Sequence, residues 1–311
     1  MNIDILVGDS LHLPLPDKHF HTCVTSPPYW GLRDYGLGSD SLGLEPTPEL
    51  YVQHLVDIFR EVRRTLRDDG TLWLNLGDSY ASQGGSRDYG SSDNGTGRGP
   101  AVGGNRAPSP GLKPKDLVGI PWMVAFALRA DGWYLRSDII WHKPNVMPES
   151  VRDRPTKAHE YLFLLSKSKR YYYDGEANKE PTTGTARKCG QNSRANVDRD
   201  VLHGTRKQDA IGKSRYVGFN DRYDFANPSK KRNRRSVWNI ATQPYPDAHF
   251  ATFPEKLVEP CILAGCLEGG TVLDPFAGSG TVGVVAQRLE RNATLIDAKP
   301  EYCELARERV S

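Results

Sequence analysis

Two short motifs in the chain combine residue types that could support chemistry. The first is TSPPYW at residues 25–30, where two prolines follow an apolar stretch. Proline has no N–H and a fixed φ, so the pair must end a strand and hold Ser26 and Tyr29 on a stiff turn. Two simpler interpretations are a loop that only leaves the sheet and a surface polyproline segment.

The second motif is GSGTVG at residues 278–283, directly after the apolar stretch TVLDPF. It matches the GxGxxG pattern of dinucleotide sites, and Asp297 follows at the distance where an acid can bind ribose hydroxyls. A nicotinamide-dependent dehydrogenase is therefore one candidate, and glycines that only tighten a strand-to-helix turn are another. A Walker loop is excluded because no GK[ST] follows.

Residues just before the glycines favour a different adenosine ligand. The loop opens with Asp274-Pro275-Phe276, which places a carboxylate where an ammonium group could pair with it. S-adenosylmethionine carries positive charge at its sulfur and its amino group, has no pyrophosphate, and offers a ribose diol that one carboxylate can bind. No set of residues suited to hydride transfer is evident downstream, which also favours this cofactor.

Alternating strands and helices are expected to position both motifs. Apolar runs predict strands at 3–7, 21–26, 71–76, 138–142 and 160–167, and a strand, a helix and a strand across 271–297. Helices are predicted from Glu49 to about Arg67, ended by Asp69-Gly70, and around 120–132. The run Tyr171-Tyr172-Tyr173 is interpreted as a strand face. This alternation is typical of an α/β domain.

Composition limits the class of protein. The chain has 311 residues, 38% hydrophobic content and a formal net charge of +3, which excludes neither a small-molecule enzyme nor a nucleic-acid binder. Its five cysteines are widely spaced and include no CxxC pair, so we expect reduced thiols, no metal site and a cytoplasmic location. No run of about 18 apolar residues occurs, and we predict a protein that is neither exported nor membrane-spanning.

Two segments interrupt the periodic pattern. Residues 82–111 are rich in Gly, Ser, Asn and Pro and are expected to form a flexible loop. Residues 187–235 contain fourteen Arg and Lys against five Asp and Glu. This mixture suits phosphate neutralisation and base contacts, although a solvated, partly disordered insertion has the same composition.

Together, TSPPYW and DPFAGSGT make the chain resemble the amino-methyltransferases that methylate exocyclic nitrogens of DNA bases. The order of the motifs is similar to the β class of that family. The resemblance implies a Rossmann-like fold that depends on S-adenosylmethionine, with a mostly parallel seven-stranded sheet, circularly permuted so that it opens at the third strand. It also implies three segments: a catalytic half at 1–174, a basic target-recognition insertion at 175–236, and the cofactor-binding half at 237–311.

The resemblance assigns the cofactor site. Phe276, Gly278, Ser279, Gly280 and Thr281 would lie along the methionine part, beside Asp274. Three further positions complete the set: Asp297 would bind the ribose and Asp9 the adenine, while Thr252 and Phe253 are candidates for the carboxylate end. A turn-forming role is the alternative for Asp9.

The catalytic turn would consist of Ser26, Pro27, Pro28 and Tyr29. An exocyclic amine is a poor nucleophile because its lone pair is delocalised into the ring. The Ser26 hydroxyl and the Pro27 carbonyl could accept its two N–H bonds and direct the lone pair toward the sulfonium methyl. Tyr29, with Trp30 as a second candidate, would stack on a base rotated out of duplex DNA, whereas Trp30 could equally pack in the core.

Serine at the head of the motif is associated mainly with cytosine N4, and we therefore expect a site-specific cytosine-N4 methyltransferase, with adenine N6 as the alternative. A nucleic-acid-binding protein without turnover is a more distant alternative, as is the dehydrogenase. Double-stranded DNA is the expected partner. A cognate restriction endonuclease and a homodimer are left open.

Overall fold

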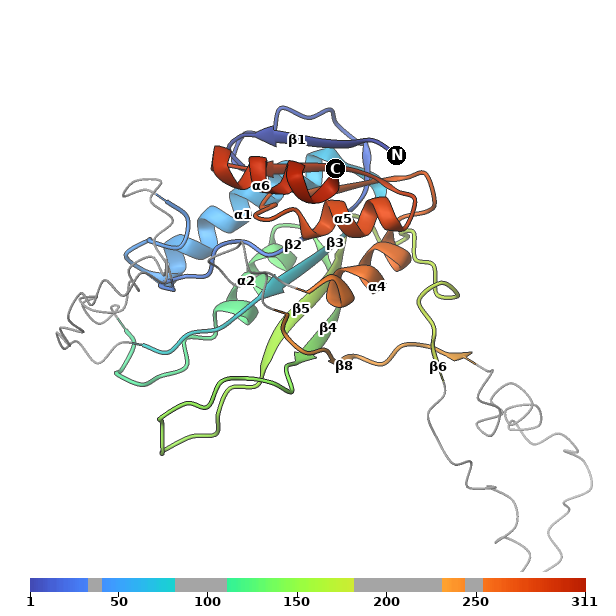
Figure 1. Ribbon diagram of the computed structural model, residues 1–311. Helices are drawn as coiled ribbons and strands as arrows, with labels where there is room; N and C mark the ends of the chain where they lie inside the picture. Colours follow the sequence, from blue (N-terminus) through green and yellow to red (C-terminus); the bar gives the residue numbers. More distant parts are fainter. Residues whose placement is uncertain (33–40, 82–110, 182–230, 244–253) are drawn as a thin grey trace, which may run out of the picture. The chain divides into compact units, whose positions relative to one another are not determined.

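The computed structural model describes residues 1–32, 41–81, 111–181, 231–243 and 254–311 (Figure 1). The predicted loop at 82–111, except Gly111, and most of the basic insertion lie outside these residues, as do Thr252 and Phe253. The chain divides into two compact units, Met1–Asp174 with Arg235–Ser311 and Gly175–Arg234.

The first unit is built on a sheet of eight described strands. Their order is β1 (Ile3–Val7), β10 (Asn292–Asp297), β9 (Thr271–Asp274), β2 (Phe20–Thr25), β3 (Leu66–Leu76), β5 (His159–Ser166), β4 (Tyr134–His142) and β8 (Val237–Asn239). Only β5 runs antiparallel to its neighbours. The predicted mostly parallel α/β fold is confirmed, and the three-residue β8 makes the sheet one strand wider than predicted.

The first strand of the chain pairs with the last. β1 lies parallel to β10, from Ile3 opposite Ala293 to Val7 opposite Asp297. Two strands from opposite ends of the sequence therefore lie side by side at one edge of the sheet. Figure 1 shows both termini beside β1 and the last helix, α6 (Pro300–Val310).

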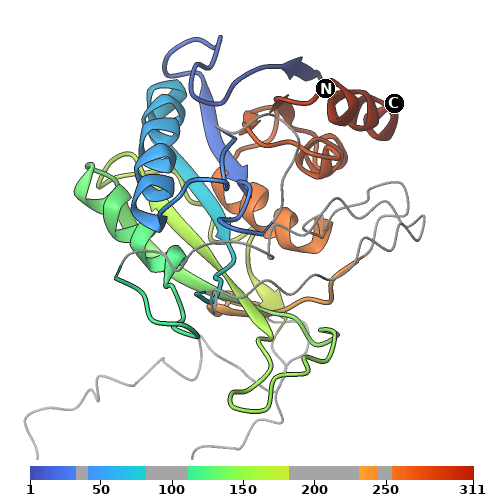
Figure 2. The same ribbon diagram turned by 90° about the vertical axis from the view of Figure 1, so that its left-hand side faces the viewer.

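Helices cover both faces of the sheet (Figure 2). On one face, α1 (Pro48–Thr65) and α2 (Ile120–Ala130) pack over alternate residues of β3, among them Leu72, Leu74 and Leu76. On the other face, α4 (Glu255–Gly265) and α5 (Thr281–Arg288) pack with Trp73 and its neighbours, and α6 lies against α5 and β1. Successive side chains of a strand point to opposite faces, so β3 contributes residues to the hydrophobic cores on both sides of the sheet.

Two local predictions were wrong. Helix α1 ends at Thr65 rather than near Arg67, because Leu66 is already extended and pairs with Phe20 of β2. The register then shifts, so Asp69-Gly70 lies in a bulge of β3 and does not end the helix. The three tyrosines at 171–173 follow the end of β5 at Ser166 and are not part of a strand.

The second unit is described at its two ends. Strand β6 (Glu180–Pro181) pairs antiparallel with β7 (Lys231–Arg232), and an ion pair joins Arg232 Nε to Glu180 Oε1 at 2.9 Å. Arg234 also donates a hydrogen bond to the Asn178 side chain at 3.0 Å. The two ends of the basic segment are thus held together.

Candidate active site

The predicted site residues meet at one edge of the sheet. Strands β1, β10, β9, β2 and β3 are adjacent and parallel, so their carboxyl ends point the same way. Ser26 follows β2, Asp274 ends the neighbouring β9, and Asp297 ends β10. Ligands of open α/β sheets bind at this edge.

The catalytic turn and the glycine bend (residues 274–281) are joined directly. Thr25, the residue before Ser26, donates its hydroxyl to Asp274 Oδ1 at 2.7 Å, and both groups are buried. Two motifs about 250 residues apart in the chain thus share a hydrogen bond. The catalytic turn and the glycine bend therefore lie side by side in the fold, as predicted from the sequence.

Side chains from other elements hold the turn. Tyr51 of α1 donates its hydroxyl to the Pro28 carbonyl at 2.8 Å. The Trp30 indole is buried in the core and donates to the Glu45 carbonyl at 2.9 Å. Trp30 therefore packs in the core, which was the alternative to a base-stacking role.

Tyr29 is anchored at its hydroxyl end. The hydroxyl donates to Glu160 Oε2 at 2.8 Å and accepts from Asn75 Nδ2 at 2.7 Å. Burial raises the pKa of Tyr29 well above its ordinary value, and the charge of Glu160 adds to this, so the phenol stays protonated. The ring lies so close to Gly77 that a Cβ there would be 2.4 Å from Tyr29 Cε2.

Asn75, Glu160 and Lys143 are residues that the motifs did not reveal. Asn75 of β3 also donates to Ser26 Oγ at 3.3 Å, and Lys143 forms an ion pair with Glu160. For Asn75 the sequence offers one signal, a polar residue at an otherwise apolar strand position in LWLNL. Buried polar side chains of this kind are normally hydrogen-bonded.

Asp274 lies beneath the bend rather than on its surface. It is fully buried, and its Oδ1 accepts from Thr25 and from the Phe276 N–H at 3.0 Å. Burial raises the pKa of Asp274 to about 7, and the nearby Asp297 acts in the same direction. Its second oxygen, Oδ2, has no hydrogen-bond partner among the described residues.

Glycine is required in the bend for conformation and for space. Gly278 and Gly280 have φ of 49° and 77°, and a Cβ on Gly280 would lie 2.8 Å from the Ala306 Cβ in α6. The side chains of Ser279 and Thr281 are buried and accept hydrogen bonds from Arg309 at 2.9 and 3.1 Å. Both residues belong to the cofactor site predicted from the sequence, whereas Arg309 does not.

Two carboxylates flank the bend. Asp297 accepts from the Gly278 N–H at 2.9 Å and from the Lys299 N–H at 3.0 Å, and burial raises its pKa. Asp9 is exposed and accepts from the Leu11 N–H at 2.9 Å, so it forms the local turn that was its structural alternative. The adjacent Ser10 hydroxyl donates to the Pro275 carbonyl at 2.7 Å and ties this loop to the bend.

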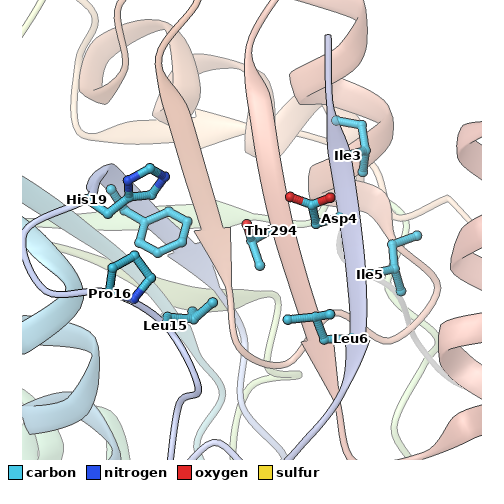
Figure 3. Close-up of a pocket in the computed structure, with 9 residues that line it drawn as sticks. Ile3, Asp4, Ile5, Leu6, Leu15, Pro16, His19 and Thr294 are labelled. Carbon is cyan, nitrogen blue, oxygen red and sulfur yellow. The ribbon is translucent and has the colours of Figure 1, made fainter.

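A pocket of about 380 Å³ lies elsewhere on the sheet (Figure 3). Leu6 of β1 and Thr294 of β10 lie on one side of the pocket, and Leu15 and His19 lie on the other. Thr294 lies within β10, and Leu15 and His19 lie in the segment before the amino end of β2, away from the carboxyl ends of the strands. The pocket is therefore separate from the site.

Two searches confined to the described part of the chain were negative. Its His, Cys, Asp and Glu side chains form no group of three that could hold a metal ion. None of its helices is both long and apolar enough to span a membrane.

Comparison with known proteins was made for sequence and for structure. The model of the N6/N4 methyltransferase family, described as DNA methylase, matches residues 20–308. The chain is 50% identical to the Type II methyltransferase M.SmaI of Serratia marcescens, over 98% of this chain and 90% of that protein. It is 47% identical to the Type II methyltransferase M.Cfr9I of Citrobacter freundii, over 97% and 86%.

Solved structures share the fold. The cytosine-N4-specific PvuII DNA methyltransferase matches with a TM-score of 0.58 and 20% identity, covering 100% of this chain and 87% of that one. The M1.HpyAVI–SAM complex matches with a TM-score of 0.51 and 15% identity, covering 99% and 100%.

Proposed function

The chain belongs to the N6/N4 DNA methylase family, and from this premise we propose that it methylates the exocyclic N4 amine of cytosine in duplex DNA. S-adenosylmethionine is the cofactor of this chemistry and supplies the methyl group from its sulfonium. The observation that carries the proposal is the position of Ser26, joined through Thr25 and Asp274 to the glycine bend.

The residues of the bend fit this cofactor. Asp274 Oδ2 is a buried acceptor without a partner, which suits a cationic ligand with N–H donors. Asp297 is half-buried beside Gly278, where its carboxylate retains lone pairs for ribose hydroxyls. Asp9, Thr252 and Phe253 remain proposed contacts to the adenine and the carboxylate end.

The chain's own residues would activate the target amine by orientation. The Ser26 hydroxyl oxygen and the Pro27 carbonyl accept its two N–H bonds, which directs the nitrogen lone pair toward the methyl group. Tyr29 offers its ring to a base rotated out of the duplex. Since Tyr29 is held by Glu160 and Asn75, this platform is formed before the DNA binds.

Cytosine is preferred over adenine because serine heads the motif, and family members with serine there act mainly on cytosine N4. Adenine N6 is the alternative, since its amine offers the same two N–H bonds. Sequencing DNA from a host that expresses the protein distinguishes them. We expect N4-methylcytosine at one recognition sequence. Finding N6-methyladenine instead would show that the target is adenine N6.

A Ser26→Ala variant tests the role of the turn. Removing one oriented polar group from a reaction centre costs on the order of 100-fold in rate, which is the loss we expect in methyl transfer to DNA. Calorimetry should show unchanged affinity for S-adenosylmethionine. Transfer at the parental rate would refute the mechanism, and a folded parent protein that never methylates DNA would favour the alternative of a non-catalytic nucleic-acid binder.

The basic segment at 175–236 is proposed as the target-recognition region. Its Arg and Lys would neutralise phosphates, so DNA affinity should fall steeply with salt. Replacing Lys231, Arg232, Arg234 and Arg235 with Gln should flatten that dependence. If the salt dependence of DNA affinity did not change, the segment would be a solvated insertion that does not contact the phosphates.

Partners and location follow from a DNA substrate. Double-stranded DNA would place the protein with the nucleoid in the cytoplasm. Because the two relatives above are named Type II methyltransferases, a restriction endonuclease that reads the same sequence is the proposed functional partner. Because the chain belongs to the DNA methylase family, the GxGxxG match does not indicate a nicotinamide-dependent dehydrogenase.

A further inference from the structure

The catalytic turn has few ways to be held through its own backbone. Pro27 and Pro28 have no N–H, so neither can donate a hydrogen bond to a neighbouring strand or loop. The Pro28 carbonyl accepts from Tyr51, but this contact does not reach the Ser26 side chain. The orientation of the Ser26 hydroxyl must therefore depend on side chains that approach from elsewhere.

Three side chains converge behind the turn. Asn75 comes from β3, Glu160 from β5, and Lys143 directly follows β4. Glu160 Oε2 accepts from both the Tyr29 hydroxyl at 2.8 Å and Asn75 Nδ2 at 3.0 Å, while Oε1 faces the Lys143 ammonium. One carboxylate therefore joins the turn to all three strands.

The Glu160 side chain is held in one position by its ion pair with Lys143. Its side chain is 16% exposed and that of Lys143 is 17% exposed, so water screens their attraction only weakly. The Lys143 ammonium also lies 4.2 Å from the centroid of the Trp141 ring, over its face. An ion pair held in this way keeps the carboxylate in one place.

The carboxylate decides which way the hydroxyl protons point. An ionised carboxylate can only accept, so the single hydroxyl proton of Tyr29 is directed to Glu160. The Tyr29 oxygen already accepts from Asn75 at 2.7 Å, and its remaining lone pair accepts from Ser26 Oγ over a longer distance of 3.4 Å. With its proton directed toward Tyr29, Ser26 presents oxygen lone pairs to a target amine.

We propose that Glu160 is a positioning residue that acts through Tyr29 to orient the Ser26 hydroxyl as a hydrogen-bond acceptor for the target amine. The proposal rests on the proposed function, because it assigns Ser26 the role of accepting an amine N–H. It adds a polarity to the site: protons point from Ser26 to Tyr29 and from Tyr29 to Glu160. Lys143 completes the arrangement at the far end.

Single-turnover methyl transfer to DNA, at saturating S-adenosylmethionine, tests this inference. Glu160→Gln keeps the size of the side chain but adds an N–H₂ group that can donate toward Tyr29 and reverse the polarity. We expect its rate to fall by about 100-fold, the loss that a misplacement of about 1 Å at a reaction centre can cause. Glu160→Asp, which restores an acceptor-only group, should recover part of the rate.

A double-mutant cycle separates orientation from general damage. If Glu160 acts through the Tyr29 hydroxyl, Tyr29→Phe combined with Glu160→Gln should be no slower than the slower single variant. The matched control is Glu61→Gln, which breaks a partly exposed ion pair with Arg64 on α1, remote from the turn. It should change the rate less than about 2-fold, as surface ion pairs contribute little.

Three outcomes would overturn the inference. They are a parental rate for Glu160→Gln, rate losses that multiply in the double variant, and loss of affinity for S-adenosylmethionine equal to the loss of rate. If circular dichroism shows that Glu160→Gln does not fold, the double-mutant cycle is measured with Tyr29→Phe and Glu160→Asp instead. An inactive parent protein would refute the proposed function, whereas an active parent with an unaffected Glu160→Gln would refute only this inference.

Discussion

The catalytic turn and the glycine bend end neighbouring strands, yet they are held in different ways. The bend has features that its own residues set, since Gly278 and Gly280 adopt positive φ and Asp274 accepts from the Phe276 N–H two residues later. Asp297 and Arg309 add hydrogen bonds to it from β10 and α6. The turn depends on side chains that lie far away in the chain, chiefly Asn75 and Glu160. Changes in either region should therefore have separable effects, on cofactor affinity for the bend and on rate for the turn.

The largest separable effect is expected at Gly77. Replacing it with Ala would place a Cβ 2.4 Å from Tyr29 Cε2, so the ring must move and its bonds to Glu160 and Asn75 must lengthen. Misplacement of this kind costs on the order of 100-fold in rate. We expect that loss in methyl transfer per folded molecule, with nearly parental affinity for S-adenosylmethionine by calorimetry.

Gly265→Ala is the matched control for Gly77→Ala. Its Cβ would lie 2.7 Å from Thr22 Oγ1, a comparable clash inside the core but not at Tyr29. It should lower the thermal midpoint and leave the rate per folded molecule unchanged. If Gly77→Ala retained the parental rate, the turn would not depend on the Tyr29 ring.

A smaller effect, on affinity, is expected at Arg309. Its guanidinium donates to the Ser279 carbonyl and hydroxyl, to the Thr281 hydroxyl, and to Glu255 at the start of α4. Arg309→Met leaves buried acceptors without partners, which costs about 1–3 kcal/mol. We expect S-adenosylmethionine to bind about 10-fold more weakly if part of this cost falls on the bend, while the rate at saturation stays near parental.

Arg288→Met is the control for Arg309→Met. Arg288 pairs with Glu255 and Glu259 but makes no described contact with the bend. Calorimetry should therefore find its affinity for S-adenosylmethionine within about 2-fold of the parent, as expected for partly exposed ion pairs. Equal weakening by both variants would mean that Glu255, and not the bend, transmits the effect.

The smallest effect is a pH dependence centred on Asp274. Its pKa is raised to about 7, so below neutral pH the group is protonated in the folded protein. A cationic ligand favours the ionised form, and affinity for S-adenosylmethionine should rise a few-fold between about pH 6 and 8 and then level off. Without ligand, the folded state holds an extra proton between its ordinary pKa of 3.8 and about 7, so the free energy of unfolding should decrease as pH rises through that interval.

Asp274→Asn isolates this group from its neighbours. Asn keeps the oxygen that accepts from Thr25 and Phe276 but cannot ionise. Asp297 faces the same region with a raised pKa, and the buried Cys23 thiol beside Asp274 stays protonated because its own pKa is raised further. Calorimetry from pH 6 to 8 should show a flatter profile for the variant, and an unchanged profile would assign the titration to Asp297.

The sequence alone predicted most of the strands and helices in their order, but not α4 or β8. Apolar periodicity located β1, β2, α2 and the strand–helix–strand unit, because burial of alternate or every third to fourth residue leaves a local pattern. The two motifs were also local, since prolines and glycines act through their own backbone. The end of α1 was missed because Leu66 pairs with Phe20 on a distant strand, which overrides the local Asp69-Gly70 signal.

Only the tertiary structure decided what surrounds those motifs. Asp274 is buried and linked to Thr25, Ser279 and Thr281 face Arg309, and Glu160 supports Tyr29. Each of these contacts joins residues that the fold brings together from separate strands or helices, so no spacing along the chain encodes them. Backbone conformation is set within a few residues, whereas the partners of a buried polar group are set by whichever elements the sheet places beside it.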